Sequence, residues 1–357
     1  MSVVLAIILA ILIFSVLIFI HEFGHFIAAK LSGVQVNEFA MFMGPAIVKW
    51  QRGETQYSIR CIPIGGYCAM EGEDEDTDNP RSFQKAAWWK RLIILVAGSF
   101  MNFLAGVLIV AVVLFNQPYF VNPQVATVEP WSTVGGETGL QVGDRIVEFN
   151  GDKIRIYEDF KLATILLPDG EYDITVVRDG KRVELVDVPM YRQIITDENG
   201  NESALYGIGF QAQETTLESV PGRILPTSIN HVRSVIFSLK MLLTGEAGVK
   251  DMSGPVGILA MMADVATESE TTGIALLNLL SFGGFIAINL AVMNLLPIPA
   301  LDGGRVVGLL LTTAIEAIIR KKLNPKYEGY IHAVGMILML LLIALITFKD
   351  IFGLFKR

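Results

Sequence analysis

The sequence predicts an α-helical polytopic membrane protein with about four transmembrane helices, into which an extracytoplasmic α+β domain is inserted. Two observations carry this prediction. The 357 residues have a mean hydropathy of +0.51 and only 18% of them are charged, against about 25% in soluble domains. The apolar runs also stand on both sides of a polar, turn-rich segment at residues 116–272. The composition therefore excludes an ordinary soluble protein.

The charge balance excludes a second class of function. The chain holds 28 Lys and Arg against 36 Asp and Glu, a formal net charge of −8. It has no run rich in Lys and Arg, whereas a nucleic-acid-binding surface needs a basic patch that neutralises phosphates. We therefore expect no nucleic acid partner.

Four apolar runs are long enough to cross a bilayer, whose ~30 Å hydrocarbon core takes about 20 helical residues. They are residues 3–20, 92–115, 273–296 and 330–348. A cleaved signal peptide is the alternative for the first run, but no basic residue precedes it and no small-residue cleavage site follows it. Trp88, Trp89, Lys90 and Arg91 precede the second run, as suits a headgroup interface.

A fifth segment, residues 224–243, is apolar on one face only. It carries His231, Arg233 and Lys240, and charged side chains are costly in hydrocarbon. We therefore expect this amphipathic helix to lie in the membrane interface or to pack on the protein.

The positive charges predict the orientation of the chain. Lys and Arg gather in the connections at residues 30–91 and 305–326, and such connections face the cytoplasm. Both termini and residues 116–272 are then expected on the extracytoplasmic side of the cell (inner, cytoplasmic) membrane. The lipid bilayer is an expected partner of the chain. The two cysteines, Cys61 and Cys68, are too few for a disulfide framework and suit free thiols in a reducing compartment.

An H-E-x-x-H pattern stands at the end of the first apolar run. His21 and His25 are separated by one helical turn, so both imidazoles face one way and can bind one Zn²⁺, while Glu22 reaches a water on it. The alternative is that these polar residues only mark where the helix leaves the membrane. The remaining histidines, His231 and His332, have no ligand-like neighbours in the sequence and are expected to be structural.

A catalytic zinc needs a third protein ligand and one open position. Asp302 is the preferred candidate, because it is the only carboxylate between residues 270 and 316 and it follows the third apolar run. Pro297 and Pro299 precede it, and two prolines so close break a helix and free backbone groups. A plain turn with Asp302 as its cap is the alternative. Because His21 and His25 lie at the predicted cytoplasmic end of their span, a shared metal requires Asp302 at that face, in agreement with four spans.

The segment between the second and third runs predicts a compact α+β unit at residues 124–190. It has an alternating strand at 124–130, an Asn150-Gly151 turn, a helix at 157–167 and a hairpin around Asp179-Gly180. This pattern resembles a PDZ domain of the periplasmic-protease kind, and such domains bind extended peptides by strand addition. A steric lid without a ligand is the alternative, because no basic residue marks a carboxylate pocket.

Further motifs extend these patterns along the chain. They are Met43-Gly44-Pro45, Ile62-Pro63-Ile64-Gly65-Gly66-Tyr67, Ala97-Gly98-Ser99-Phe100-Met101-Asn102-Phe103 and Ser253-Gly254-Pro255-Val256-Gly257. Together with the motifs above, they make nearly the whole chain similar to the site-2 intramembrane metalloproteases. The chain resembles the bacterial regulator-of-sigma-E protease type, with a single PDZ-like domain where some members carry two.

The resemblance implies a function and the residues that carry it. Zn²⁺ would be held by His21, His25 and Asp302, and Glu22 would be the general base. Asn294 would hold the substrate backbone, and a membrane-associated β-hairpin around Gly65-Gly66 would pair with the substrate as an added strand. The implied substrate-binding residues are Asn294, Pro297, Pro299, Gly65 and Gly66. The substrates would be transmembrane segments of single-pass proteins, such as anti-sigma factors or signal-peptide remnants, after a first extracytoplasmic cut. No organic cofactor is implied.

The predicted organisation has four parts: an N-terminal membrane half (1–117), the PDZ-like domain (118–195), an extracytoplasmic or interfacial linker with the amphipathic helix (196–272) and a C-terminal membrane half (273–357). A catalytically silent membrane scaffold that presents the PDZ-like domain is the main alternative function. The presence of Glu22 weakens it, because a scaffold needs no base. An ion transporter would need polar residues along several spans, whereas here they cluster at one depth.

Overall fold

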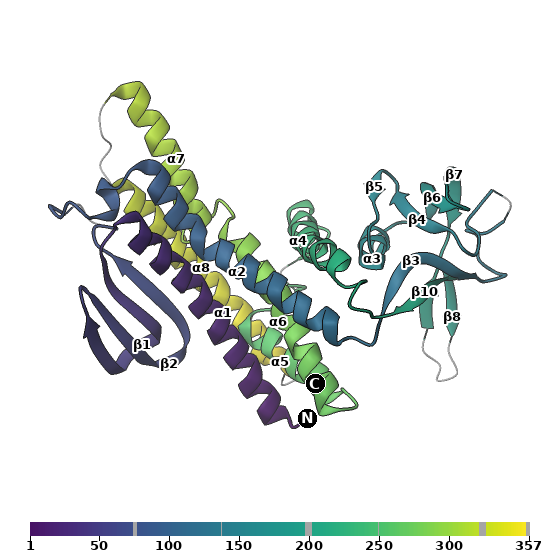
Figure 1. The fold of residues 1–357 in the computed structure, drawn as a ribbon, viewed down its shortest axis with the longest axis horizontal. Helices are drawn as coiled ribbons and strands as arrows, with labels where there is room; N and C mark the ends of the chain where they lie inside the picture. Colours follow the sequence, from purple (N-terminus) through teal and green to yellow (C-terminus); the bar gives the residue numbers. More distant parts are fainter. Residues whose placement is uncertain (74–76, 137, 197–201, 249, 321–325, 355–357) are drawn as a thin grey trace. The chain divides into compact units, whose positions relative to one another are not determined.

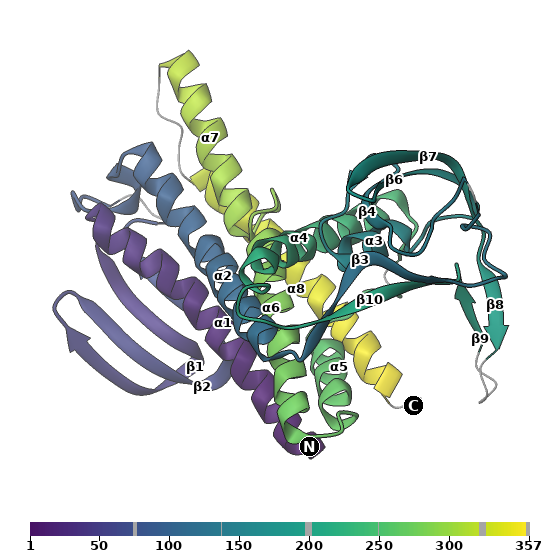
Figure 2. The same cartoon turned by 45° about the vertical axis from the view of Figure 1, so that its right-hand side comes forward.

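The computed structural model describes residues 1–357 except 74–76, 137, 197–201, 249, 321–325 and 355–357. The chain forms two compact units. We call Met1–Val110 together with Val235–Arg357 the helical unit, and Ala111–Ser234 the sheet unit. Figures 1 and 2 show the elements of each unit from two directions.

Long helices dominate the helical unit: α1 (Val3–Ser32), α2 (Trp88–Asn116, which ends in the sheet unit), α5 (Pro255–Thr267), α6 (Thr272–Asn294), α7 (Asp302–Ile319) and α8 (Lys326–Leu354). Among the described residues, α1, α2, α6 and Gly329–Gly353 of α8 are long and apolar enough to cross a membrane. The four predicted runs fall on these helices. The amphipathic segment forms α4 (Pro221–Thr244), which is not one of the four candidate spans in the described part of the chain.

Many apolar side chains of these helices point away from the protein. Val4 in α1 is 69% exposed, and Leu341 in α8 is 62% exposed. A surface of this kind is stable in hydrocarbon, where exposed aliphatic side chains cost nothing, but it is a liability in water. The exposure therefore agrees with helices that are surrounded by lipid.

Glycines let the helices of this unit approach closely. A Cβ on Gly24 of α1 would lie 2.5 Å from the Ala97 carbonyl oxygen of α2, and one on Gly106 of α2 would lie 2.5 Å from Cγ1 of Ile288 in α6. Small residues at helix crossings are typical of membrane bundles, because packing rather than the hydrophobic effect holds the helices together. Figure 1 shows α1 and α2 side by side.

The hairpin implied by the resemblance is formed by β1 (Val36–Arg52) and β2 (Thr55–Met70), and it lies against α1 (Figure 2). Residues 38–41 pair with residues 66–69 and also with residues 56–59. Gly44 and Gly65, at φ +84° and +83°, allow the sharp bends that this pairing requires. Within the described residues, the segment 66–70 pairs only with the start of β1, so it forms one edge of the hairpin sheet.

Helix α7 occupies the region that the charge pattern assigned to a connection at residues 305–326. Charge alone reveals the side of the membrane and not the backbone conformation. Leu309 of α7 is buried in the core that contains Ala28 of α1 and Ile94 of α2, so apolar packing stabilises a helix there.

The sheet unit contains β3 (Tyr119–Val128), β4 (Arg145–Phe149), β5 (Asp152–Lys153), α3 (Tyr157–Thr164), β6 (Gly170–Arg178), β7 (Lys181–Met190), β8 (Gln193–Thr196), β9 (Glu202–Leu205) and β10 (Ile208–Glu214). The main sheet has the order β10-β3-β4-β6-β7, β5 pairs with β4, and β8 pairs with β9. Phe149, Phe160 and Ile174 belong to its core. The predicted helix and the hairpin around Asp179-Gly180 are present as α3 and β6–β7.

The predicted boundary at residue 195 does not coincide with the end of this unit. Strand β10 pairs with β3, from Ile208 opposite Val128 to Glu214 opposite Tyr119. The region assigned to a linker, residues 196–272, therefore supplies an edge strand of the main sheet. The partners of this ladder are far apart in the sequence, and local patterns do not reveal such pairing.

Candidate metal centre

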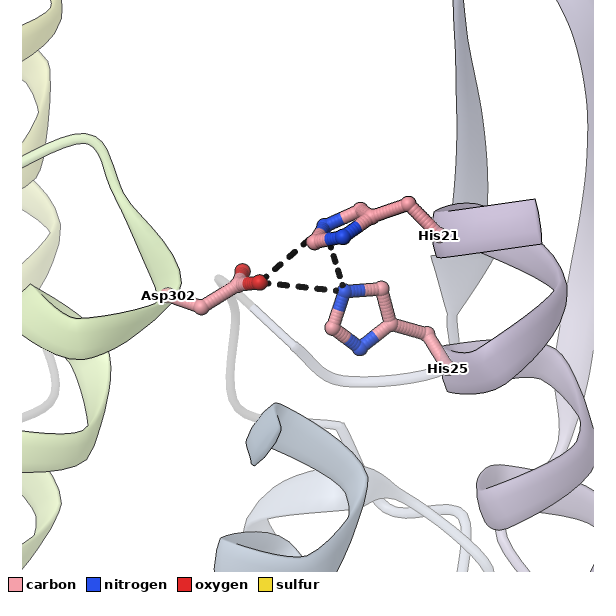
Figure 3. Close-up of side chains that lie close together, drawn as sticks. All are labelled: His21, His25 and Asp302. Atoms are coloured by element: carbon pink, nitrogen blue, oxygen red, sulfur yellow. Dashed lines mark hydrogen bonds and ion pairs between the residues drawn. The ribbon is translucent and has the colours of Figure 1, made fainter. Parts of the chain in front are cut away.

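His21 and His25 on α1 meet Asp302 at the start of α7 (Figure 3). The Asp302 Oδ2 atom lies 3.1 Å from His21 Nε2 and 3.2 Å from His25 Nε2. The two Nε2 atoms are 3.2 Å apart. Both histidines are buried, and Asp302 is half-buried. One carboxylate and two imidazoles thus form a nearly equilateral triangle of donor atoms.

This triangle fits a zinc ion. Two atoms bound tetrahedrally at about 2.0–2.1 Å from one metal are about 3.3 Å apart, close to the three measured separations. Asp302 Oδ2 is buried and accepts no hydrogen bond in the described part of the chain. A buried carboxylate oxygen without a donor is costly, and a divalent cation would remove that cost.

His25 has a fixed tautomer. Its Nδ1 atom lies 2.8 Å from the Ile94 carbonyl oxygen of α2. A carbonyl can only accept, so Nδ1 carries the proton and Nε2 offers a lone pair toward Asp302 and His21. Such a backbone contact is a common way to orient a metal-binding imidazole.

Two residues of α2, Gly98 and Asn102, lie against the two histidines. A Cβ on Gly98 would lie 2.4 Å from His25 Nε2 and 2.8 Å from His21 Cε1, so only glycine leaves room for both rings. One helical turn later, Asn102 is 1% exposed and its Nδ2 atom lies 3.3 Å from His21 Nδ1. The Asn102 Oδ1 atom is buried without a hydrogen-bond partner among the described residues.

A tight turn between α6 and α7 positions Asp302. A Cβ on Gly303 would lie 2.3 Å from the Leu295 carbonyl oxygen, and one on Gly304 would lie 2.3 Å from that of Ile298. Ala300 adopts a positive φ of 81° in the same turn. The chain can therefore fold back on itself here only because both residues after Asp302 lack side chains.

The metal triangle opens into a cavity of about 660 Å³. Its wall includes Glu22 and, from β2, the edge residues Tyr67, Cys68, Ala69 and Met70. Gly66 is adjacent to Glu22, since a Cβ on Gly66 would lie 3.3 Å from Cγ of Glu22. Arg305 and Glu73, which form an ion pair, also line the cavity.

An ion-paired carboxylate, Glu38, links the two strands of the hairpin through Arg60. Partial burial alone would raise the pKa of Glu38, but hydrogen bonds from Arg60 and Ser58 lower it to about 2. Burial raises the pKa of Tyr67 to about 12, so its hydroxyl stays neutral. Burial also raises the pKa of the Cys68 thiol, and both Cys61 and Cys68 are free.

The remaining predicted residues differ in their distance from the triangle. Asn294 at the end of α6 has its Nδ2 atom 3.5 Å from both ring nitrogens of His21. Gly65 is at a bend of the hairpin, where a Cβ would lie 2.9 Å from Met43 Cγ. Pro297 is exposed, and Pro299 packs against Gly335 of α8. Among the described residues, neither proline lines the cavity.

Gly98 and Asn102 lie in the motif at residues 97–103, which by itself predicts no role for either residue. Their spacing puts both on one face of α2, and this was the signal available. What it could not reveal was that this face meets α1 at the histidines. His231 lies in the sheet unit, away from the triangle along the chain, and the side chain of His332 lies outside the described residues.

Comparison with known proteins identifies the family of this chain. Residues 9–342 match the model of peptidase family M50. A protein of Clostridium perfringens named as a zinc metalloprotease is 35% identical over 97% of this chain and 98% of its own length. The regulator of sigma-W protease RasP of Bacillus subtilis is 28% identical over 97% of this chain and 98% of its own length. The chain therefore belongs to peptidase family M50 and is a zinc metalloprotease.

Proposed function

We propose that this protein is an intramembrane endopeptidase of the site-2 type, which cleaves transmembrane segments of single-pass membrane proteins after a first extracytoplasmic cut. One observation carries the proposal. The triangle of His21, His25 and Asp302 is supplied by α1 and by the turn that follows α6, and both helices are long and apolar enough to span a membrane. A protease centre in that location meets peptide bonds that are themselves in a bilayer.

The residues divide the chemistry among them. When bound, Zn²⁺ supplies Lewis acidity and lowers the pKa of a coordinated water toward 7. His21, His25 and Asp302 would hold it. Glu22, in the wall of the same cavity, would take the proton of the attacking water and pass it to the leaving amine. This role for Glu22 disfavours the silent scaffold.

Asn102 would orient His21. A half-turn of its amide exchanges the two side-chain atoms and brings Oδ1 to His21 Nδ1, where it accepts the ring proton. The His21 Nε2 atom would then carry a free lone pair, as His25 Nε2 already does. Asn102 would thus do for one histidine what the Ile94 carbonyl does for the other.

Substrate binding would use the edge of the hairpin. A helical substrate hides its peptide bonds in its own hydrogen bonds, so it must unwind, and its freed amides then need partners in a low-dielectric site. The segment 66–70 has an edge in the hairpin sheet and lines the cavity, so an added strand would satisfy them. Asn294 would hold substrate backbone near the metal, while Pro297 and Pro299 would shape the turn that ends α6.

The topology belongs to the same proposal. Both termini and the sheet unit would lie outside the cell membrane, with the metal centre near its cytoplasmic side. The sheet unit would be a PDZ-like domain that filters substrates by size. Anti-sigma factors or signal-peptide remnants would be the substrates, and the name of the Bacillus subtilis relative, a regulator of sigma-W protease, supports the former.

Co-expression tests the proposal. The chain is expressed in membranes with tagged single-pass anti-sigma factors that lack their outer domains, and the products are mapped by mass spectrometry. We expect cleavage within the transmembrane segment that Glu22→Gln abolishes. Cleavage only outside the membrane, or cleavage unchanged by Glu22→Gln, would contradict the proposal.

A further inference from the structure

The sheet unit contains a second cavity, of about 320 Å³, that no step of proteolysis uses. Strands β3 and β10, the start of α4 and residues 155–156 form its wall. Its polar lining consists largely of amide and guanidinium groups: Asn122, Gln124, Gln213, Arg145, Arg155 and Arg223. No carboxylate lines it within the described part of the chain. We call it the arginine cavity.

Arg223 is the buried cation of this cavity, with 8% of its surface exposed. It donates through Nη1 to Asn122 Oδ1 at 3.1 Å and through Nη2 to the Val121 carbonyl at 3.2 Å. Its guanidinium lies over the Phe120 ring, 4.0 Å from the centroid. Its Nε has no partner among the described residues, and the nearest carboxylate contact is a long one, 3.5 Å to Glu158. The positive charge of Arg223 is therefore only partly compensated.

Arg145 and Arg155 add two exposed guanidinium groups to the same wall. Neither forms an ion pair with any described residue. The other arginines of the sheet unit contrast with them, because each has a carboxylate partner at 2.5–3.3 Å: Arg178, Arg182, Arg192 and Arg233. In a chain with a net charge of −8, two unpaired arginines beside a partly compensated buried one indicate a site for an anion.

The position of the cavity along the chain indicates where that anion is. Candidate span α2 ends at Asn116, four residues before Phe120, a reach of at most about 14 Å. Exposed apolar side chains flank its lining residues in the sequence: Tyr119 (61%), Leu217 (81%) and Leu225 (56%). Aromatic and aliphatic side chains next to arginines are typical of segments that sit at a lipid headgroup layer.

We propose that the arginine cavity binds the phosphate headgroup of an anionic phospholipid, on the membrane face where α2 ends. Arg145 and Arg155 would form charge-assisted hydrogen bonds to the phosphate oxygens, and the buried Arg223 would add a fixed positive charge behind them. The exposed Tyr119, Leu217 and Leu225 would contact the acyl region. The bound lipid would anchor the sheet unit to the bilayer surface. This inference does not depend on the proposed function.

Native mass spectrometry of the full chain in detergent tests the proposal, with phosphatidylglycerol and phosphatidylcholine as matched probes. The test variant is Arg145→Gln/Arg155→Gln, which leaves buried Arg223 in place. The control is Arg182→Gln/Arg192→Gln, which removes two arginines from ion pairs elsewhere in the unit. We expect the wild type and the control to retain phosphatidylglycerol over phosphatidylcholine. The test variant should lose at least about fivefold of that preference while keeping its zinc and its circular dichroism spectrum.

Three results would overturn the proposal. One is equal retention of phosphatidylglycerol by the test variant and the control. Another is equal retention of both lipids by the wild type. The third is competition by millimolar inorganic phosphate that removes all of the preference, because the cavity would then take a soluble phosphate and not a lipid.

Discussion

Two carboxylates of the helical unit lie at the N-terminal ends of helices, and their surroundings differ. Asp350 on α8 is 8% exposed, and its Oδ2 accepts hydrogen bonds from the backbone amides of Gly254 and Gly257 at 2.9 Å each. It therefore caps α5 and lies favourably at the positive end of that helix. Asp302 opens α7, but its buried Oδ2 has no hydrogen-bond donor among the described residues and faces His21 and His25.

This difference indicates that Asp350 has a structural role, whereas Asp302 is available for a metal ion. An ionisable residue in a helix of membrane length suggests a functional site by default, yet Asp350 has its hydrogen bonds supplied by the fold. The glycines of the 253–257 motif make this possible, since a Cβ on Gly254 or Gly257 would lie within about 3 Å of its Oδ2. Asp302 Oδ2, by contrast, has no hydrogen-bond donor among the described residues. The two carboxylates are therefore distinguished by whether the fold supplies hydrogen bonds to them, and not by their burial alone.

Substitutions in the metal triangle should have the largest effect on zinc binding and proteolysis. We expect Asp302→Asn, His21→Ala and His25→Ala each to reduce bound zinc from about one equivalent to near zero and to abolish proteolysis, because each removes a metal ligand. Glu22→Gln should abolish proteolysis and keep the zinc. Metal analysis of the purified variants separates the two classes. Full zinc occupancy in Asp302→Asn would refute its assignment as a ligand.

The second largest effect is expected when a side chain is added at Gly98, next to the two histidines. Gly98→Ala puts a Cβ 2.4 Å from His25 Nε2, so we expect zinc affinity to fall by about 100-fold. Gly106→Ala is the matched control on the same helix, because its Cβ meets only packing atoms of α6 at 2.5 Å or more. Both variants should lose about 1–3 kcal/mol of stability, but Gly106→Ala should keep its affinity for zinc, measured by competition with a chelator. Equal affinities in the two variants would mean that the space at Gly98 serves packing alone.

A smaller effect is expected at Asn102. Asn102→Leu removes the proposed acceptor for His21 Nδ1 and should weaken zinc binding by about 10–100-fold. Asn102→Asp supplies a stronger acceptor and should restore it. Cobalt substitution gives an independent spectroscopic measurement, since the visible absorption bands report ligand geometry without turnover. Failure of the aspartate to restore affinity would show that Asn102 acts through packing and not through the ring tautomer.

The opposite pattern is expected at Asp350. Asp350→Ala leaves two backbone amides of α5 without their acceptor, which should cost about 1–3 kcal/mol and lower the melting temperature. Zinc content should stay at about one equivalent, because Asp350 does not reach the metal. Loss of zinc with an unchanged melting temperature would erase the distinction between the two carboxylates.

The smallest effect concerns His231, a histidine expected to be structural. Burial lowers the pKa of His231 to about 4, below its ordinary value of 6.5. The unfolded chain takes up a proton below about pH 6.5 while the folded chain does not, so stability should fall between about pH 6.5 and 4, by at most about 3 kcal/mol. Thermal melts against pH should show this slope, and His231→Gln should flatten it without changing zinc content. An unchanged slope in the variant would assign it to other groups.

These contrasts also show how far local sequence patterns reach. The H-E-x-x-H spacing predicted two residues of the triangle, because neighbours on one helical turn are set by helix geometry alone. Asp302 followed by elimination among few carboxylates. Gly98 and Asn102 could not be inferred, since their roles depend on how closely α2 approaches α1. For the same reason the pairing of β10 with β3, and the packing of Leu309 that makes α7 a helix, were missed.

The metal triangle joins the first helix of the chain to the seventh. During biosynthesis α1 leaves the ribosome long before Asp302 does, so the nascent chain offers only two of the three proposed ligands for most of its synthesis. Two imidazoles do not complete a catalytic zinc site. The protease should therefore remain inactive until its last third has been inserted and α7 has folded. We therefore expect that the separation of the proposed ligands along the chain keeps a partly synthesised protein inactive toward other membrane proteins.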